Sequence, residues 1–156
     1  MVRPSLSAKV LTALAGKRLA TAESLTGGGI GQAITAVSGA SAVFAGGVIS
    51  YTNEVKHKVL GVPVEILDAY GPVCGPVAQA MAEGARRVIG ADVAVAVTGL
   101  AGPGGDEYGN PEGTVFIGYS DENSTVVKPC LFSGDRESIR NQTIEAALNL
   151  VLTMQK

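Results

Sequence analysis

Residues 91–98 read ADVAVAVT, and every side chain from Val93 to Val97 is apolar. A strand with one face in water alternates apolar and polar side chains, whereas a strand covered on both faces is apolar throughout. We therefore predict that Ala91–Thr98 is the central strand of a sheet, with helices packed on both of its faces.

The rest of the 156-residue chain supplies such helices and further strands. Apolar residues at helical or strand spacing mark these elements, and turn residues such as Gly16 end them. The predicted helices are Ser5–Ala15, Ile30–Ala36, Asn53–Leu60, Pro63–Ala69, Gly75–Ile89 and Asp135–Met154, the first capped by Ser5 or Ser7 and the last by Gly134-Asp135. The other predicted strands are Arg18–Ala22, Phe44–Tyr51, Val115–Tyr119 and Thr125–Phe132, the last two forming a hairpin.

This order of elements predicts one α/β domain over residues 1–156. Because helices flank and separate the strands, the expected architecture is a three-layer α/β/α sandwich with a mostly parallel mixed sheet.

Charge and hydropathy exclude several classes of protein. The formal net charge is −2 and no basic stripe is present, which argues against binding to nucleic acid. No apolar stretch approaches the roughly 20 residues that span a bilayer. The segment Met1–Lys9 lacks the apolar core of a signal peptide. We therefore expect a cytoplasmic protein without membrane or nucleic-acid partners.

The residues that commonly hold metals are scarce. His57 is the only histidine, and Cys74 and Cys130 are the only cysteines, neither with a close-spaced partner. A zinc site needs clustered His or Cys ligands, so we predict no metal and no cofactor. The two cysteines are expected to be buried free thiols, with a disulfide as the alternative, and His57 a partly exposed helix residue.

Ser24 is the first candidate for chemistry, because it falls between a predicted strand and a predicted helix, before three glycines. Such a turn presents a hydroxyl at the carboxyl edge of the sheet, where open α/β folds bind ligands. The helix that follows offers N–H donors to an anion. The alternative is that Ser24 and Thr26 only cap this helix.

A serine nucleophile needs a base, and Lys56 is the candidate that the sequence offers. It follows Tyr51 across a second junction between strand and helix, which is expected at the same edge. Burial lowers the pKa of a lysine and makes it a base, while a tyrosine hydroxyl orients or relays the proton. A solvated Lys56 and a core Tyr51 are the alternatives.

Two further segments have the composition of anion-binding sites. The loop Thr98–Gly105, with the sequence TGLAGPGG, is able to present backbone N–H groups to a phosphate or carboxylate. Arg136 and Arg140 lie one turn apart on the last predicted helix, and guanidinium groups match phosphate oxygens. Each pattern also has a purely structural interpretation. Glycine-rich turns are common in proteins, and the two arginines could instead form surface ion pairs with Asp135 or Glu137.

Taken in order, these segments resemble the CinA carboxy-terminal domain family over nearly the whole chain. The matching motifs are residues 22–28 (AESLTGG), 46–56 (GGVISYTNEVK), 98–105 (TGLAGPGG), 111–115 (PEGTV) and 132–140 (FSGDRESIR).

The resemblance implies a nicotinamide-nucleotide amidase, which hydrolyses the carboxamide of nicotinamide mononucleotide to the acid and releases ammonia. Carried over by motif, Ser24 is the nucleophile, Lys56 its base and Tyr51 an assisting residue. The implied substrate-binding residues, which also supply oxyanion or phosphate donors, are Thr26, Gly27, Gly28, Thr98, Gly99, Gly102, Arg136 and Arg140. A homo-oligomer that works without metal is implied as well.

The chain departs from the family pattern in three places. Leu25 stands where the family often has Cys, and Cys74 stands where it often has Ser. Many relatives also carry a larger amino-terminal domain, described as a pyrophosphatase, whose activity we do not expect here. Two rival hypotheses remain: a nucleotide-binding module without an activated Lys56, and an amidase for a different small amide.

Overall fold

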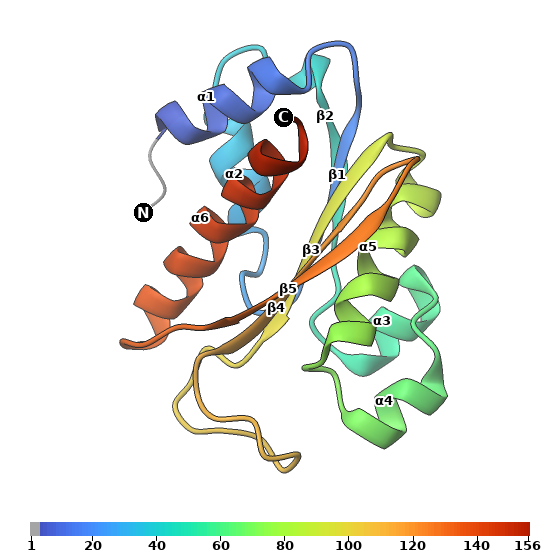
Figure 1. Ribbon diagram of the computed structural model, residues 1–156, viewed down its shortest axis with the longest axis vertical. Coiled ribbons are helices and arrows are strands. Elements are labelled where there is room, and N and C mark those ends of the chain that lie inside the picture. Colours follow the sequence, from blue (N-terminus) through green and yellow to red (C-terminus); the bar gives the residue numbers. More distant parts are fainter. Residues whose placement is uncertain (1–3) are drawn as a thin grey trace.

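The computed structural model describes residues 4–156 of the chain, and within them helices flank and separate the strands as the sequence predicts (Figure 1). The elements are α1 (Pro4–Ala13), β1 (Leu19–Glu23), α2 (Gly29–Thr35), the short 3-10 helix η1 (Ala40–Ala42), β2 (Phe44–Ile49), α3 (Asn53–Leu60), α4 (Val64–Tyr70), α5 (Gly75–Ile89), β3 (Val93–Gly99), β4 (Thr114–Ser120), β5 (Thr125–Leu131) and α6 (Arg136–Met154). Each predicted helix and strand is present, with its ends within two residues of those expected.

The strands form one mixed sheet in the order β2-β1-β3-β4-β5. Strand β1 pairs in parallel with β2 and with β3, whereas the β3–β4 and β4–β5 pairs are antiparallel. Since β5 reverses direction again after β4, four of the five strands run the same way. The predicted mixed sheet and the late hairpin are thereby confirmed.

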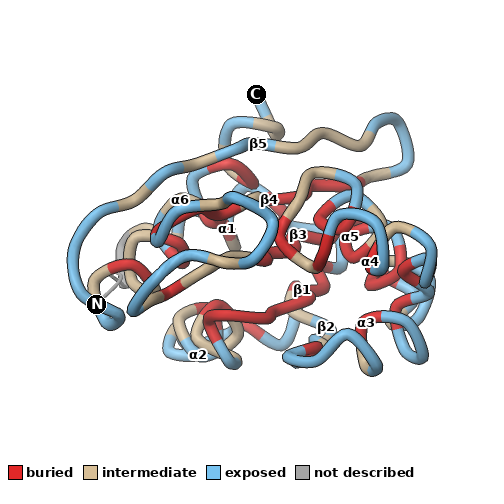
Figure 2. Tube along the Cα trace, turned by 90° about the horizontal axis from the view of Figure 1, so that it is seen from below, coloured by how far each residue is buried: buried red, intermediate tan, exposed pale blue. Residues whose placement is uncertain are grey.

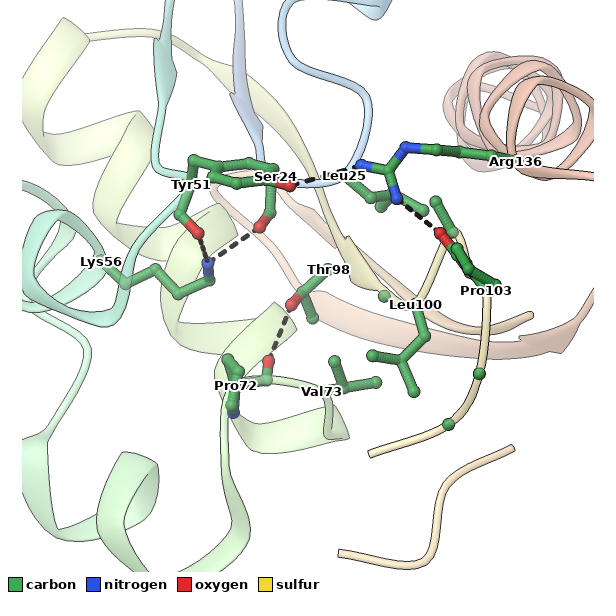
Figure 3. Close-up of a pocket in the computed structure, with 15 residues that line it drawn as sticks. Ser24, Leu25, Tyr51, Lys56, Pro72, Val73, Thr98, Leu100, Pro103 and Arg136 are labelled. Atoms are coloured by element: carbon green, nitrogen blue, oxygen red, sulfur yellow. Dashed lines mark hydrogen bonds between the residues drawn. The ribbon is translucent and has the colours of Figure 1, made fainter. Parts of the chain in front are cut away.

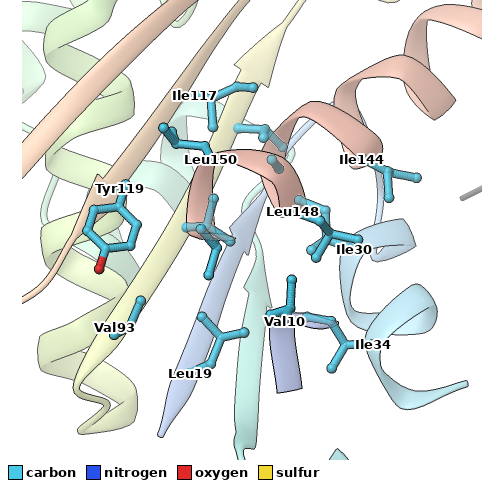
Figure 4. Close-up of a cluster of buried hydrophobic side chains, with 14 of the residues drawn as sticks. Val10, Leu19, Ile30, Ile34, Val93, Ile117, Tyr119, Ile144, Leu148 and Leu150 are labelled. Atoms are coloured by element: carbon cyan, nitrogen blue, oxygen red, sulfur yellow. The ribbon is translucent and has the colours of Figure 1, made fainter. Parts of the chain in front are cut away.

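Strand β3 is the buried central strand, and its alternate side chains enter two separate cores. Val93, Val95 and Val97 pack with α1, α2 and α6 on one face (Figure 4). Ala94 and Ala96 face α5 and the ends of α3 and α4 on the other. Figure 2 shows the buried trace running through the middle of the molecule. The three-layer α/β/α sandwich is therefore confirmed.

The start of α1 differs from the expectation. The helix includes both Ser5 and Ser7, so neither serine caps it. The side-chain hydroxyl of Ser7 is buried and has no hydrogen-bond partner among the described residues. The described part of the helix begins at Pro4. Asp135 caps α6 as predicted, accepting the N–H of Ser138 at 2.8 Å.

No helix between residues 4 and 156 combines the length and the hydropathy needed to cross a membrane.

Helix α3, which carries Lys56, packs against α5, and α5 packs against the sheet. Gly84 lies on the face of α5 that meets the end of α3, and an added Cβ there would overlap the carbonyl oxygen of Leu60. A glycine at this position therefore sets how closely α3 packs.

We predict that Gly84→Ala destabilises the fold by about 1–3 kcal/mol, because the obstacle is backbone and overpacking forces a shift of α3. Chemical denaturation measures the change. The matched control is Gly75→Ala on the same helix, where a Cβ meets only Val127 at 3.7 Å. Equal stability of the two variants would contradict this account of the packing.

Candidate active site

A cavity of about 340 Å³ lies where β1, β2 and β3 end (Figure 3). Segments far apart in the sequence meet there: the turn after β1, the junction of β2 with α3, the segment before α5, the glycine-rich loop after β3 and the start of α6. The residues that line the cavity are Ser24, Leu25, Tyr51, Lys56, Pro72, Val73, Thr98–Gly105 and Arg136. A concave site at the carboxyl ends of parallel strands is the usual place for a ligand in an open α/β fold.

Lys56 is buried at the base of this cavity, with 1% of its surface exposed. Its Nζ donates to Ser24 Oγ at 2.9 Å and to the carbonyl oxygen of Ser50 at 2.7 Å. No carboxylate among the described residues forms an ion pair with it. Burial therefore lowers its pKa from 10.5 to about 8. The solvated lysine that the sequence left open is excluded.

Ser50 holds the lysine in place, and sequence reasoning missed it. Its N–H donates to the carbonyl oxygen of Glu23 at 2.7 Å and its hydroxyl to the same oxygen at 3.3 Å. Its own carbonyl accepts from Lys56. The end of β2 is thus tied to the end of β1, next to Ser24. A serine at a strand end gives no distinctive signal in one sequence.

Ser24 is almost fully buried, with 7% of its surface exposed, and its hydroxyl accepts from Lys56. Its N–H donates to Val97 and its carbonyl accepts from Gly27, which fixes the turn. The N-cap of α2 is Gly28, at φ +107°, and no side chain caps the helix from that position. The alternative role of Ser24 and Thr26 as caps is therefore wrong.

The carboxylate of Glu23 accepts hydrogen bonds from the N–H groups at the start of α2. It accepts from Gly28 at 3.2 Å, from Ile30 at 2.9 Å and from Gly31 at 3.0 Å. The expectation that these donors are free for an anionic ligand is wrong, since an internal carboxylate already occupies them. The N–H groups of the turn without an acceptor in the described part of the chain are those of Leu25 and Thr26.

Tyr51 lies at the mouth of the cavity and not in the core. Its side chain is 60% exposed, and its hydroxyl accepts from Arg136 Nη2 at 3.4 Å. The group of Tyr51 that contacts Lys56 Nζ is the backbone carbonyl, at 3.4 Å. The core position that the sequence allowed is therefore excluded, and the hydroxyl lies on the side of the cavity from which a ligand enters.

The two arginines of α6 occupy different places. Arg136 lines the cavity, where it donates to the carbonyl oxygen of Gly102 at 2.6 Å as well as to Tyr51. Arg140 lies behind the serine turn and donates to the carbonyl oxygens of Leu25 at 3.0 Å and Thr26 at 3.2 Å. Only Arg136 is placed to touch a ligand in the cavity.

The structure brings together most of the predicted site. Ser24, Lys56, Tyr51, Arg136 and the loop residues Thr98, Gly99 and Gly102 line the cavity, whereas Thr26, Gly27, Gly28 and Arg140 do not. Thr26 is buried against the carboxylate of Glu23. The hydroxyl of Thr98 donates to the carbonyl oxygen of Pro72 at 2.7 Å, which positions a neighbouring wall of the cavity.

The remaining candidates lie outside the site. His57 is exposed, and its Nδ1 is 2.8 Å from the carbonyl oxygen of Val62. Cys74 and Cys130 are free, which excludes the disulfide, and both are half-buried. Residues 4–156 contain no group of three or more His, Cys, Asp or Glu side chains that could hold a metal ion.

Comparison with known proteins places this chain in a described family. The family profile of the CinA C-terminal domain matches residues 4–155. A CinA-like protein of Anaeromyxobacter sp. (strain K) is 47% identical over 136 residues, covering 87% of this chain and 33% of the relative. One from Geobacter sulfurreducens is 48% identical over 134 residues, covering 86% and 32%. The chain therefore spans about a third of these curated relatives.

Solved structures match over almost their whole length. The competence damage-inducible protein A of Klebsiella pneumoniae superposes with a TM-score of 0.94 at 37% identity, covering 96% of this chain and 94% of that one. The competence/damage inducible protein CihA of Agrobacterium tumefaciens has a TM-score of 0.94 at 36% identity, covering 98% and 95%.

The two departures from the family motifs have distinct surroundings. Leu25 is 4% exposed and packs into the core shared by α2 and α6, while it also borders the cavity. Cys74 does not line the cavity. It is the N-cap residue of α5, with extended backbone and no side-chain capping hydrogen bond.

We predict that Cys74→Ser stabilises the protein by about 0.5–1 kcal/mol, because a serine hydroxyl caps a helix better than a thiol. Thermal denaturation measures the gain. Cys130→Ser, on β5, is the control and should bring no such gain. A destabilised Cys74→Ser variant would show that the thiol is held by packing and not by its capping position.

Proposed function

Because the chain belongs to the CinA C-terminal domain family, we propose that its cavity hydrolyses the carboxamide of nicotinamide mononucleotide. The products are nicotinic acid mononucleotide and ammonia. The observation that supports this most directly is the 2.9 Å contact between the buried Lys56 amine and Ser24 Oγ. This pair supports the reaction class, and the family resemblance supports the choice of substrate.

The first half of the reaction forms an acyl-enzyme. Neutral Lys56 accepts the Ser24 hydroxyl proton as Oγ attacks the carboxamide carbon. The protonated amine then returns that proton to the nitrogen of the tetrahedral intermediate. The C–N bond breaks and ammonia leaves, so that the acyl group stays on Ser24 as an ester.

The second half regenerates the serine. Neutral Lys56 accepts a proton from a water molecule, whose oxygen attacks the ester carbon. The lysine then protonates Ser24 Oγ as the acid departs. One water is consumed and one ammonia released, so the atoms balance without a further reactant.

Negative charge develops on the carbonyl oxygen in both halves and needs hydrogen-bond donors. The N–H groups of Leu25 and Thr26 are available for it, because every other N–H from Ser24 to Gly31 has an acceptor within the described residues. The residue after a nucleophile commonly supplies such a donor.

The rest of the cavity suits an aromatic amide with a phosphate. Val73, Leu100 and Ala101 give it an apolar wall for the pyridine ring. Arg136 and the glycine-rich loop provide a cation and backbone groups for the phosphate. The volume of about 340 Å³ is in the range of small-molecule sites. A homo-oligomer working in the cytoplasm completes the proposal.

We predict that the purified protein releases ammonia from nicotinamide mononucleotide in EDTA, and that Ser24→Ala abolishes the release while substrate affinity stays within about threefold. An enzyme-coupled ammonia assay and calorimetry measure the two quantities. Binding without turnover by the wild type would favour a nucleotide-binding module. Turnover by Ser24→Ala would refute the assignment of the nucleophile.

We predict that kcat/KM rises about tenfold per pH unit below pH 8 and levels off above it, because only the neutral amine is a base. Burial lowers the pKa of Lys56 to about 8, so the active form gains population as pH rises through that value. Rates from about pH 6 to pH 10 test this. Lys56→Ala should be inactive throughout. A plateau already reached at pH 7 would point to another base.

We predict that Arg136→Ala raises KM for the nucleotide by about tenfold or more but leaves KM for the free riboside nearly unchanged, because only the nucleotide has a phosphate. Arg140→Ala is the matched control on the same helix, and it should not discriminate between the two substrates. Equal effects of Arg136→Ala on both substrates would place the phosphate elsewhere.

A further inference from the structure

Glu23 is a buried acidic residue that the reaction above does not use. It directly precedes Ser24, and 2% of its surface is exposed. No cation pairs with it among the described residues. Burying a carboxylate costs free energy unless hydrogen bonds compensate its charge. The hydrogen-bond donors around Glu23 therefore have to provide this compensation.

Four donors from one short segment surround this carboxylate. Thr26 Oγ1 donates to Oε1 at 2.6 Å, and the N–H groups of Gly28 and Ile30 donate to the same oxygen. The N–H of Gly31 donates to Oε2 at 3.0 Å. All four donors lie within eight residues of Glu23. The Glu23 side chain therefore links the two ends of the turn that contains Ser24.

The same turn is held from the other side by Arg140, which donates to the carbonyl oxygens of Leu25 and Thr26. The segment between Ser24 and Thr26 is therefore held by an anion that accepts from the Thr26 hydroxyl and by a cation that donates to its carbonyl oxygens. Both side chains lie outside the cavity lining. They are therefore not placed to touch a ligand in the cavity.

We propose that Glu23 is the positioning residue of the nucleophile: its carboxylate, with Thr26 as its nearest partner, holds Ser24 Oγ at hydrogen-bond distance from Lys56. It also determines which N–H groups of the turn remain free, because it binds those of Gly28, Ile30 and Gly31 and leaves those of Leu25 and Thr26. This inference rests on the proposed function insofar as Ser24 is the reacting group.

The test measures the reactivity of Ser24 directly, with a small fluorophosphonate that phosphonylates activated serines. Wild-type protein should be labelled and Ser24→Ala should not, which tests the nucleophile alone. Glu23→Gln keeps the size of the side chain but turns an N–H toward Gly31. We expect it to be labelled at least about tenfold more slowly, since small misplacements of reacting groups have effects of this size.

A second pair of variants keeps the proposal testable if Glu23→Gln does not fold. Thr26→Val removes only the hydroxyl that donates to Glu23, and we expect slower labelling from it. Thr26→Ser restores that hydroxyl and should restore the rate. Ile34→Val weakens the core packing of the same helix, where Ile34 is fully buried, and should be labelled at the wild-type rate.

Two further measurements separate positioning from loss of structure. Affinity for nicotinamide mononucleotide should change less than threefold in the folded variants, and the pH midpoint of labelling should stay near that of the wild type, because Ser50 still holds Lys56. Labelling of Glu23→Gln and Thr26→Val at the wild-type rate would overturn the inference. Equal slowing by Ile34→Val would do the same, because helix stability would then suffice. An unlabelled wild type would refute the proposed nucleophile and the inference with it.

Discussion

A lysine amine that is buried with no carboxylate partner in the described part of the chain is the constraint on which the site depends. Lys56 Nζ donates to a serine hydroxyl and to two backbone carbonyls, all neutral acceptors, so its charged form is poorly compensated and its pKa falls to about 8. An acidic side chain at the same contact would raise that pKa and remove the base. The carboxylate of Glu23, the residue before Ser24, lies on the other face of β1, where N–H groups of α2 donate to it.

The fold keeps the Glu23 carboxylate away from Lys56 because successive side chains of strand β1 alternate between the two faces of the sheet. Successive side chains of β1 point to opposite faces, so Glu23 joins the side of α2 while Ala22 packs in the core of α3 and α5. The small side chains on that second face, with Gly84 on α5, let α3 approach closely enough to bring Lys56 to the end of β1. The chemistry at the cavity thus depends on packing one layer away from it.

Local patterns in the sequence were sufficient for the fold, whereas they left Ser24 as a possible helix cap and Lys56 as a possible solvated lysine, and the pair was chosen through the family resemblance. The apolar run of β3 and the helical spacing of α5 each depend on neighbouring residues alone, and both were predicted correctly. The capping role of Glu23 was not, because its partners come after it in a glycine-rich turn that fits no common capping pattern. Nor does spacing distinguish Arg136 from Arg140: both lie on one helical face, and only tertiary packing shows which of them borders the cavity.

The most direct test of this account is a titration of the Lys56 amine by NMR, in protein labelled with ¹³C and ¹⁵N at lysine. The spectrum of Lys56→Met assigns the signal among the lysines of the chain. We predict a midpoint near pH 8 for Lys56, well below the value of 10.5 that is ordinary for a lysine amine. A Lys56 signal with a midpoint at the ordinary lysine value of 10.5 would contradict the account, because the amine would then be a permanent cation at neutral pH and could not serve as the base for Ser24.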